Sequence, residues 1–514
     1  MSTFRTVSRY GILVAFAFTI LYLFIGTGLH SDDYGEIINR KNQGVIDFFA
    51  TSGFSLFGLG SYFGFWWAYP LLGFEHQWVY DLVKAVAHLL SLFFVYRFAS
   101  DYLPHDRAML SAAIFVFYPL HDTTMYWYMA VVYVFFPALL MYAHSLIRGD
   151  RIALGLFLLF IGTFAGYMSP PYVFGLACIF FFEHDYKKTA LFTFPGILYI
   201  AYYFGIKYAF PDVERRINSS LSIVDFLKQL VLQPLSFFEA AIGPSYWLKI
   251  YYAIGSIGWF SVLIATGVVV FIFTKSNTFS GRPEFPKSLF VGLLSVLLLS
   301  FGVYALTGLY HHSAFNLGNR STVYGSLLIA FMLAMLPLNK KTILFFTLIF
   351  ILPVFGLSDY WKSWNVHQKQ IIENIHTNSS LRDLERESTL LVTGNIYSKL
   401  GPFSHIEFFS MPWVVNTIFH YQVKSNDIIA LVPYIYFDNG ILIDSKLGGK
   451  YFLNKKIYVY NSDTNLVTRI SATEVPKMLA DRPPEIRHWV QLAKGTWIES
   501  SIVALSPRLA YLFL

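Results

Sequence analysis

Two adjacent carboxylates follow the first long apolar run of the chain. They are Asp32 and Asp33, in the segment HSDDYGE that begins at His30. At a membrane boundary, repulsion between neighbouring carboxylates raises the pKa of one of them. Such a pair suits a general base that accepts a proton from a hydroxyl, or a site of hard oxygen ligands for a divalent cation such as Mg or Mn. The alternative is that both residues are solvated and only end a helix on its outer side.

A second group of ionisable residues lies at the start of a later apolar run. Asp81, Lys84 and His88 are spaced i, i+3 and i+7, so they share one face of a helix. A lysine within an apolar helix normally faces the protein interior or a cavity. Two interpretations of Lys84 stay open: a structural ion pair with Asp81, or a contact with the phosphate of an anionic lipid near the outer leaflet. His88 is a supporting candidate on the same face.

A third candidate segment is the loop YHHSAFNLGNR, which ends at Arg320. Guanidinium is the preferred side chain for bidentate phosphate contacts, and its alternative role here is to reach lipid headgroups. His311 and His312 are candidates for metal ligands or hydrogen-bond donors, although no Cys, Asp or Glu stands beside them at ligand spacing. Asp122, at the outer end of another apolar run, is a further acidic candidate.

The composition indicates what kind of protein must position these residues. Of the 514 residues, 55% are hydrophobic and 13% are charged, against about 25% charged in an average globular protein. The apolar residues cluster in long uncharged runs, so the chain is predicted to be a polytopic membrane protein rather than a soluble enzyme, a disulfide scaffold or a disordered tail. Its net charge of +7 is explained by basic cytoplasmic loops and does not predict nucleic-acid binding. The single cysteine, Cys178, excludes an intramolecular disulfide and a cysteine metal cluster.

Helices that cross a bilayer need about 20 apolar residues. On that criterion we expect eleven membrane-spanning helices, at about 11–29, 80–99, 108–121, 127–147, 152–168, 171–183, 189–209, 251–273, 288–308, 321–338 and 342–358. The first is read as a retained span because its run is long for a secretory signal and no cleavage motif follows. Basic residues recur in alternate loops, which predicts a plasma-membrane protein with a cytoplasmic N-terminus and an outer C-terminus. The aromatic, Gly-rich segment 42–80 is expected to form interfacial helices in the outer loop 30–79.

The composition changes at about residue 359. Short β-rich runs follow a polar helical segment, so we expect two units: a membrane module at 1–358 and a soluble α/β domain at 359–514 on the outer face. Asp438-Asn439-Gly440 predicts a turn between two strands. The tryptophans of this domain either stack on sugar rings or belong to its core, and are Trp361, Trp364, Trp413 and Trp497.

This layout resembles the GT-C class of integral membrane glycosyltransferases, which use polyprenyl-phosphate sugars. In motif the resemblance rests on Asp32-Asp33, and in architecture it covers the whole chain. It implies bacterial members that decorate O-antigen, other envelope glycans or lipid A. The implied partners are a polyprenyl-phosphate sugar donor, a glycan or lipid-linked acceptor, and membrane lipids.

The resemblance also implies a mechanism. A carboxylate, with Asp32 favoured, takes the proton from an acceptor hydroxyl as it attacks the anomeric carbon with inversion. Arg320, and after it Lys84, stabilises the leaving lipid phosphate. Asp33 then positions Asp32, contacts the acceptor or holds a divalent ion.

Two other functions remain open. A glycan polymerase or ligase would use arginines and lysines of a central outer loop at about 210–250. Here these are Arg215, Arg216, Lys228 and Lys249. A lipid or solute transporter would need no bond chemistry, but such proteins often carry polar residues at mid-membrane and internal repeats. The sequence contains no Walker, G-x-S-x-G or H-E-x-x-H motif, so ATP-driven transport, serine hydrolysis and zinc proteolysis have no support.

Overall fold

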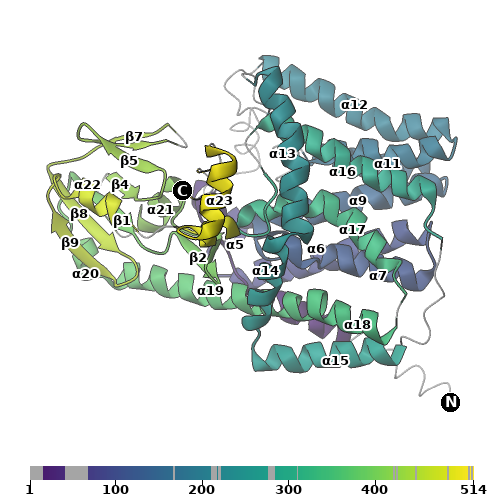
Figure 1. Ribbon diagram of the computed structural model, residues 1–514, viewed down its shortest axis with the longest axis horizontal. Coiled ribbons are helices and arrows are strands. Elements are labelled where there is room, and N and C mark those ends of the chain that lie inside the picture. Colours follow the sequence, from purple (N-terminus) through teal and green to yellow (C-terminus); the bar gives the residue numbers. More distant parts are fainter. Residues whose placement is uncertain are drawn as a thin grey trace.

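The computed structural model describes residues 15–40, 67–165, 168–209, 217, 221–275, 284–308, 311–337, 339–420, 423, 427–445, 448–482, 485–507, 510 and 513. A helical bundle forms one end of the molecule and a smaller domain with β-sheets forms the other (Figure 1). The expected interfacial helices at 42–80 fall outside the described residues as far as residue 66.

The chain is helical from its first described residues to Thr377. The helices of this part are Ala15–Phe24, α2 (Asp32–Arg40), α5 (Ala68–Leu72), α6 (Gln77–Ser100), α7 (His105–Val116), η2 (Pro119–His121), α8 (Asp122–Tyr126), η3 (Tyr128–Val131), α9 (Val132–Arg148), α10 (Ile152–Phe164), α11 (Ser169–Phe182), α12 (Tyr186–Ala209), α13 (Ile223–Ile242), α14 (Pro244–Gly255), α15 (Trp259–Lys275), α16 (Lys287–Thr307), η5 (Leu317–Thr322), α17 (Val323–Ala334), α18 (Lys340–Phe346), η6 (Thr347–Ile351) and α19 (Leu352–Thr377). Pro170 and Pro171 stand in the first turn of α11, where a missing N–H breaks no helical hydrogen bond.

Several of these helices meet the requirements of a membrane span. Within the described residues, four segments are long and apolar enough: Gln77–Ser100, Tyr128–Arg148, Lys287–Thr307 and Lys340–Thr377. Ile223–Gly255 and Trp259–Thr274 make a fifth if this bent pair is one span. The prediction of several membrane-spanning helices is therefore confirmed, while the number of eleven and the orientation stay predictions.

The region around residues 210–275 differs from the expected loop and single span. Residues 223–255 form α13 and α14, and the chain then bends by 113° into α15. At the bend, the N–H of Gly258 donates to Asp359 Oδ2 at 2.8 Å, which satisfies a backbone group that the broken helix leaves unpaired. α13 consequently crosses the end of the bundle that faces the second domain (Figure 1).

The second domain begins without a break. The helix that starts at Lys340 continues to Thr377, so the expected boundary at residue 359 falls inside it. The elements that follow are α20 (Ser379–Arg382), β1 (Ser388–Thr393), β2 (Tyr397–Leu400), β3 (Phe403–Glu407), α21 (Pro412–His420), β4 (Asp427–Ala430), β5 (Ile435–Asp438), β6 (Ile441–Asp444), β7 (Lys450–Phe452), β8 (Lys456–Asn461), β9 (Leu466–Ile470), α22 (Val475–Ala480), η7 (Trp489–Ala493) and α23 (Trp497–Leu505).

The main sheet has the strand order β4-β1-β8-β9. β1 pairs in parallel with β4 and β8, with Leu390 opposite Ile428 and Tyr458, and β9 runs antiparallel to β8. β2-β3 and β5-β6-β7 form two smaller antiparallel sheets. The expected turn at Asp438-Asn439-Gly440 joins β5 and β6 as a two-residue hairpin, for which Asn439 and Gly440 have the required positive φ. A C-terminal domain of helices and sheets is thus confirmed.

Two large hydrophobic cores lie within the described residues. One fills the helical bundle and extends to Leu400, Phe403 and Ile406 of β2 and β3. The other joins the main sheet to the N-terminal segment, because Tyr34 and Ile37 of α2 and Tyr69 of α5 cluster with Leu390 of β1. The acidic pair therefore lies where the bundle meets the second domain.

Candidate functional site

The turn before α2 is held by Asp81 of α6. The backbone N–H groups of Gly26 and Gly28 donate to its carboxylate at 2.8 and 2.9 Å, and the Thr27 hydroxyl donates at 3.1 Å. Gly28 has φ +68°, and a Cβ on it would lie 2.2 Å from Asn365 Oδ1 of α19. Glycine is therefore required here both by the backbone conformation and by the close approach of α19.

Lys84 binds the same turn from one helical turn further along α6. Its ammonium lies 2.9 Å from Asp81 Oδ1 and donates to Thr27 Oγ1, Gly28 O and Tyr126 O at 2.7, 2.7 and 2.9 Å. The side chain is fully buried. The ion pair that the i, i+3 spacing suggested is present, and protein groups accept the hydrogen bonds that the ammonium can donate.

Asp33 is fully buried in the first turn of α2. Its carboxylate accepts hydrogen bonds from Tyr69 OH at 2.6 Å, from the backbone N–H of His30 at 2.9 Å and from that of Met129 at 3.3 Å. Burial raises the pKa of Asp33 to about 7, although Tyr69, the His30 backbone and Lys84 all act to lower it. This residue is held firmly by three elements and has no access to solvent.

Asp32 is partly exposed and faces the second domain. The indole N–H of Trp413, at the start of α21, donates to its Oδ1 at 2.8 Å. The two residues are 381 positions apart in the sequence. The structure thus brings a carboxylate of the N-terminal segment and an aromatic side chain of the C-terminal domain to one place.

Arg320 lies in η5, near the segment that also contacts Asp33. Its guanidinium is 5.2 Å from the ring centroid of Trp127 and 5.7 Å from that of Tyr133, and Nη1 donates to Leu317 O at 2.7 Å. Trp127 is buried, and its indole N–H has no hydrogen-bond partner within the part of the chain that the structure describes. Because Met129 donates to Asp33, residues 127–129 connect the surroundings of Arg320 with the acidic pair.

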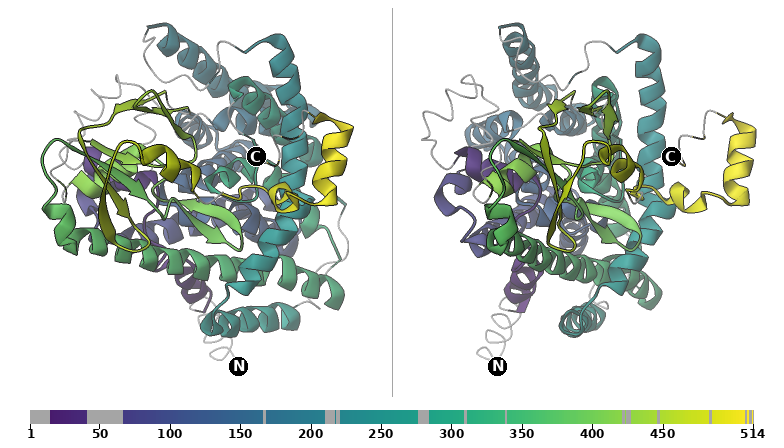
Figure 2. Two further views of the ribbon diagram at one scale, coloured as in Figure 1. Left: turned by 60° about the vertical axis from the view of Figure 1, so that its left-hand side comes forward. Right: turned by 90° about the vertical axis from the view of Figure 1, so that its left-hand side faces the viewer.

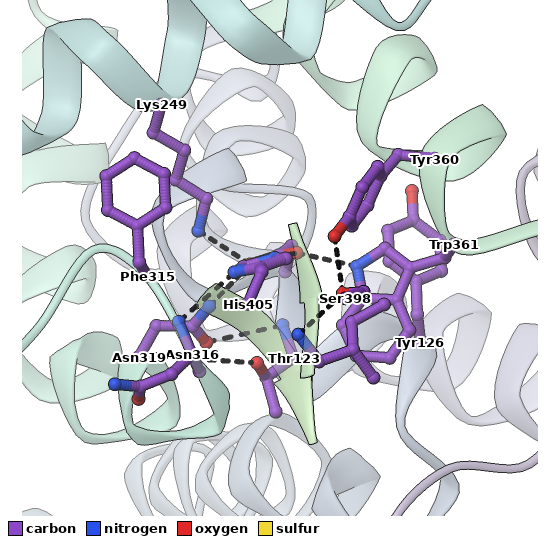
Figure 3. A network of polar contacts seen from close by, with 12 residues as sticks. Thr123, Tyr126, Lys249, Phe315, Asn316, Asn319, Tyr360, Trp361, Ser398 and His405 are labelled. Carbon is purple, nitrogen blue, oxygen red and sulfur yellow. Dashed lines mark hydrogen bonds and ion pairs between the residues drawn. The ribbon is translucent and has the colours of Figure 1, made fainter. Parts of the chain in front are cut away.

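Asp122 is the centre of a buried polar network, and Figure 3 labels its partners Lys249, Asn319, Trp361 and His405. Lys249 Nζ and Asn319 Nδ2 donate to its Oδ1 at 2.6 and 2.5 Å. Trp361 Nε1 and His405 Nε2 donate to its Oδ2 at 2.7 and 2.8 Å. Asp122 and these four partners all lie in the interior, so this carboxylate is saturated by protein donors.

The protonation state of this network follows from its hydrogen bonds. The backbone N–H of Asn316 donates to His405 Nδ1 at 3.1 Å, so the proton of a neutral imidazole lies on Nε2 and points at Asp122. Burial lowers the pKa of His405, which keeps the ring neutral. Burial alone would raise the pKa of Asp122, but Lys249 and His405 outweigh it and lower the pKa. One ion pair, Asp122 with Lys249, therefore stands at the junction of the two domains.

The other expected histidines lie apart from the acidic pair. His88 Nδ1 donates to the backbone oxygen of Lys84 at 2.8 Å, and its ring packs 4.8 Å from that of Phe24. His312 is buried against Phe237, and burial lowers its pKa to about 3. His311 is exposed at the surface. No group of three His, Cys, Asp or Glu side chains that could hold a metal ion occurs in the described ranges.

Sequence reasoning missed several residues of these sites. Lys249 appeared as a loop lysine, yet it pairs with Asp122. Trp361, expected either to stack on sugar rings or to lie in the core, is fully buried and belongs to the same network. His405 had no distinguishing sequence context, since it stands in an ordinary strand of the C-terminal domain. Trp413 was a candidate for sugar stacking, but its contact with Asp32 was not expected. Arg215 and Arg216 lie outside the described residues.

Comparisons with known proteins assign no family. No protein-family model matches the sequence, and no curated protein matches it. Among solved structures, the chain is similar to that described as the crystal structure of ArnT from Cupriavidus metallidurans bound to undecaprenyl phosphate, with a TM-score of 0.32 and 12% identity. This similarity covers 81% of this chain and 86% of that chain. A TM-score of this size does not place the chain in a family.

Proposed function

We propose that this protein is a membrane glycosyltransferase. It transfers a sugar from a polyprenyl-phosphate donor to a hydroxyl of an envelope glycan or lipid-linked acceptor, at the outer face where the C-terminal domain lies. The proposal depends on one observation about the two adjacent carboxylates at the boundary between the bundle and this domain. Asp33 is fully buried and bonded to Tyr69, whereas Asp32 is partly exposed and bonded to Trp413.

In this proposal the two carboxylates have different tasks. Asp33 is enclosed and bonded to three donors, so it positions the first turn of α2. Asp32 is partly exposed on the same turn, so an acceptor hydroxyl can approach it. A general base must come within about 2.6–3.2 Å of the proton that it removes, and of the two only Asp32 offers that access.

The donor phosphate is assigned to the surroundings of Arg320. A cationic guanidinium lies beside the buried indole N–H of Trp127, which has no partner among the described residues, so together they offer a charge and a hydrogen-bond donor to one anion. Lys84 is assigned to positioning, because its ammonium is already bonded to the turn before α2.

The reaction then follows in one step. Asp32 accepts the proton of the acceptor hydroxyl while the hydroxyl oxygen forms a bond to the anomeric carbon. The bond from that carbon to the phosphate oxygen breaks, and the lipid phosphate leaves with the electron pair. Arg320 stabilises its negative charge, and displacement from the opposite side inverts the anomeric carbon.

The test is the Asp32→Asn variant of the full-length protein in lipid nanodiscs. Transfer of radiolabelled sugar from a panel of polyprenyl-phosphate sugars to an envelope-lipid extract should fall by about 10²–10⁴, the usual contribution of a general base. Glu36→Gln, one turn further along α2 and paired with Arg40, is the matched control and should retain the rate of the parent. Equal rates for Asp32→Asn and the parent would remove the base assignment.

A further inference from the structure

The C-terminal helix α23 stands outside the body of the molecule. In both views of Figure 2 it lies beyond α13, away from the centre of the bundle. None of its nine residues is buried by the described part of the chain. Trp497 is 77% exposed and Leu505 is 85% exposed, which are high values for large apolar side chains.

The polar side chains of α23 bond to their own helix. The Ser501 hydroxyl donates to Trp497 O at 2.8 Å, the Thr496 hydroxyl accepts from the Ile498 N–H, and Glu499 accepts from the Gly495 N–H. These local bonds pair the Ser501 hydroxyl and two backbone N–H groups, whereas the Glu499 carboxylate keeps further acceptor sites. Ile498, Ile502 and Val503 pack against a small cluster of Val490, Ala493 and Phe513. The apolar side chains that the helix leaves exposed are therefore Trp497, Ala504 and Leu505.

The segment before α23 is attached to α13. Trp489 of η7 donates through its indole N–H to Glu239 Oε1 at 2.8 Å, and His488 Nε2 lies 3.3 Å from Glu239 Oε2. These contacts join the C-terminal segment to a helix of the membrane module, 250 residues earlier in the chain.

α13 itself exposes apolar residues at helical spacing. Six of its exposed apolar side chains recur every three or four residues, namely Val224, Leu227, Val231, Leu235, Phe238 and Ile242, and Ile223 and Leu232 are exposed as well. Because Ile223–Gly255 is bent by 113° from Trp259–Thr274, a membrane that α15 crosses would have α13 running along its surface. α23 lies near α13, because the segment before it is bound to Glu239.

We propose that α23 is a membrane-surface helix that inserts its apolar side chains into the lipid headgroup region beside α13. Trp497 suits the headgroup level, where indole rings concentrate. The helix contains one charged residue, Glu499, so binding needs apolar insertion and no anionic lipid. The C-terminal domain is then held to the membrane at two points, by α19 where the chain enters it and by α23 after its last strand.

The experiment measures what surrounds α23 in the full-length protein. Cys178→Ser removes the single native thiol. Trp497→Cys, Ala504→Cys and Leu505→Cys, each in that background, carry a nitroxide label in nanodiscs of phosphatidylcholine. Collision rates with oxygen, which concentrates in lipid, and with a water-soluble nickel chelate are compared. Leu466→Cys on β9, which is 61% exposed, is the matched control in the soluble domain.

We expect labels on α23 to collide several-fold more with oxygen, relative to nickel, than the label at position 466. The ratio should not change when phosphatidylglycerol is added or salt is raised. A ratio equal to that of the control would mean that α23 lies in water and would overturn the proposal. Shielding from both reagents would mean that a protein surface, from a second copy or a partner, covers the helix, which also overturns it. Ala504→Cys changes a small exposed residue and keeps the test available if replacing Trp497 disturbs folding.

Discussion

Asp33 is held in a place where its charged form costs free energy. Its pKa is raised to about 7, whereas an aspartate in an unfolded chain has a pKa of about 3.9. Between these values the unfolded chain releases its proton first, so the free energy of unfolding falls as pH rises from about 4 and levels off above about 7.

Asp33→Asn should remove this part of the pH dependence. The variant loses some stability at pH 5, because an amide N–H cannot accept from the His30 backbone. Its unfolding midpoint should then change less between pH 5 and pH 8 than that of the parent. Thermal unfolding in detergent, followed by intrinsic fluorescence, measures the midpoint of each protein at pH 5 and at pH 8. An equal change of the midpoint with pH in the variant and the parent would contradict the raised pKa of Asp33.

Arg320 is a second single residue with a testable role. In the proposal its guanidinium alone stabilises the negative charge of the donor phosphate. Arg320→Ala should weaken the binding of a polyprenyl phosphate by at least about tenfold, since charge-assisted hydrogen bonds contribute roughly 1.5–3 kcal/mol. Arg320→Lys should recover only part, because an ammonium lacks the planar face that lies over Trp127. Native mass spectrometry measures the affinity, and Arg469→Ala in β9 is the control that should bind like the parent.

At the scale of elements, the turn before α2 determines where the acidic pair lies. Gly28→Ala should destabilise the protein by ~1 kcal/mol for its positive φ and by roughly 1–3 kcal/mol more for its contact with Asn365. Gly73→Ala is the matched control, because Gly73 also has positive φ but no atom within 4 Å of a Cβ.

Unfolding midpoints of the two variants separate the two costs. The control should show only the backbone cost, and Asn365→Ala should relieve part of the additional loss in Gly28→Ala. If the two glycine variants were equally stable, the close approach of α19 would not be important for this turn.

For the whole molecule, the Asp122 network is the joint between the bundle and the C-terminal domain. Asp122→Asn leaves Lys249 buried without its counter-charge, and breaking a buried pair in this way typically costs roughly 3–5 kcal/mol. The double variant Asp122→Asn/Lys249→Met should be more stable than Asp122→Asn alone, because no buried charge remains.

Limited proteolysis and thermal unfolding test whether the buried Asp122–Lys249 pair holds the two domains together more strongly than an exposed ion pair does. In Asp122→Asn the protease should release a fragment of the C-terminal domain faster than in the parent. Glu385→Gln, which breaks the exposed pair with Lys456, should change neither measurement. Equal protection of Asp122→Asn and the parent would show that the domains are held by other contacts.

Local sequence patterns were sufficient for features that depend on neighbours along the chain. Uncharged apolar runs predicted the membrane helices, Asn439-Gly440 predicted the β5-β6 hairpin, and the i, i+3 spacing of Asp81 and Lys84 predicted their pairing as one of two options. Each follows from helix or turn geometry over a few residues.

Only the tertiary structure decided which distant residues meet. Trp413 contacts Asp32 across 381 positions, and His405 reaches Asp122 across 283, although nothing in their local sequence marks either residue. Likewise, composition made α13 and α23 apolar, but the 113° bend and the Glu239 contacts determine where their exposed faces lie. The physical reason is that packing of the whole chain, rather than local propensity, determines which buried polar groups find partners.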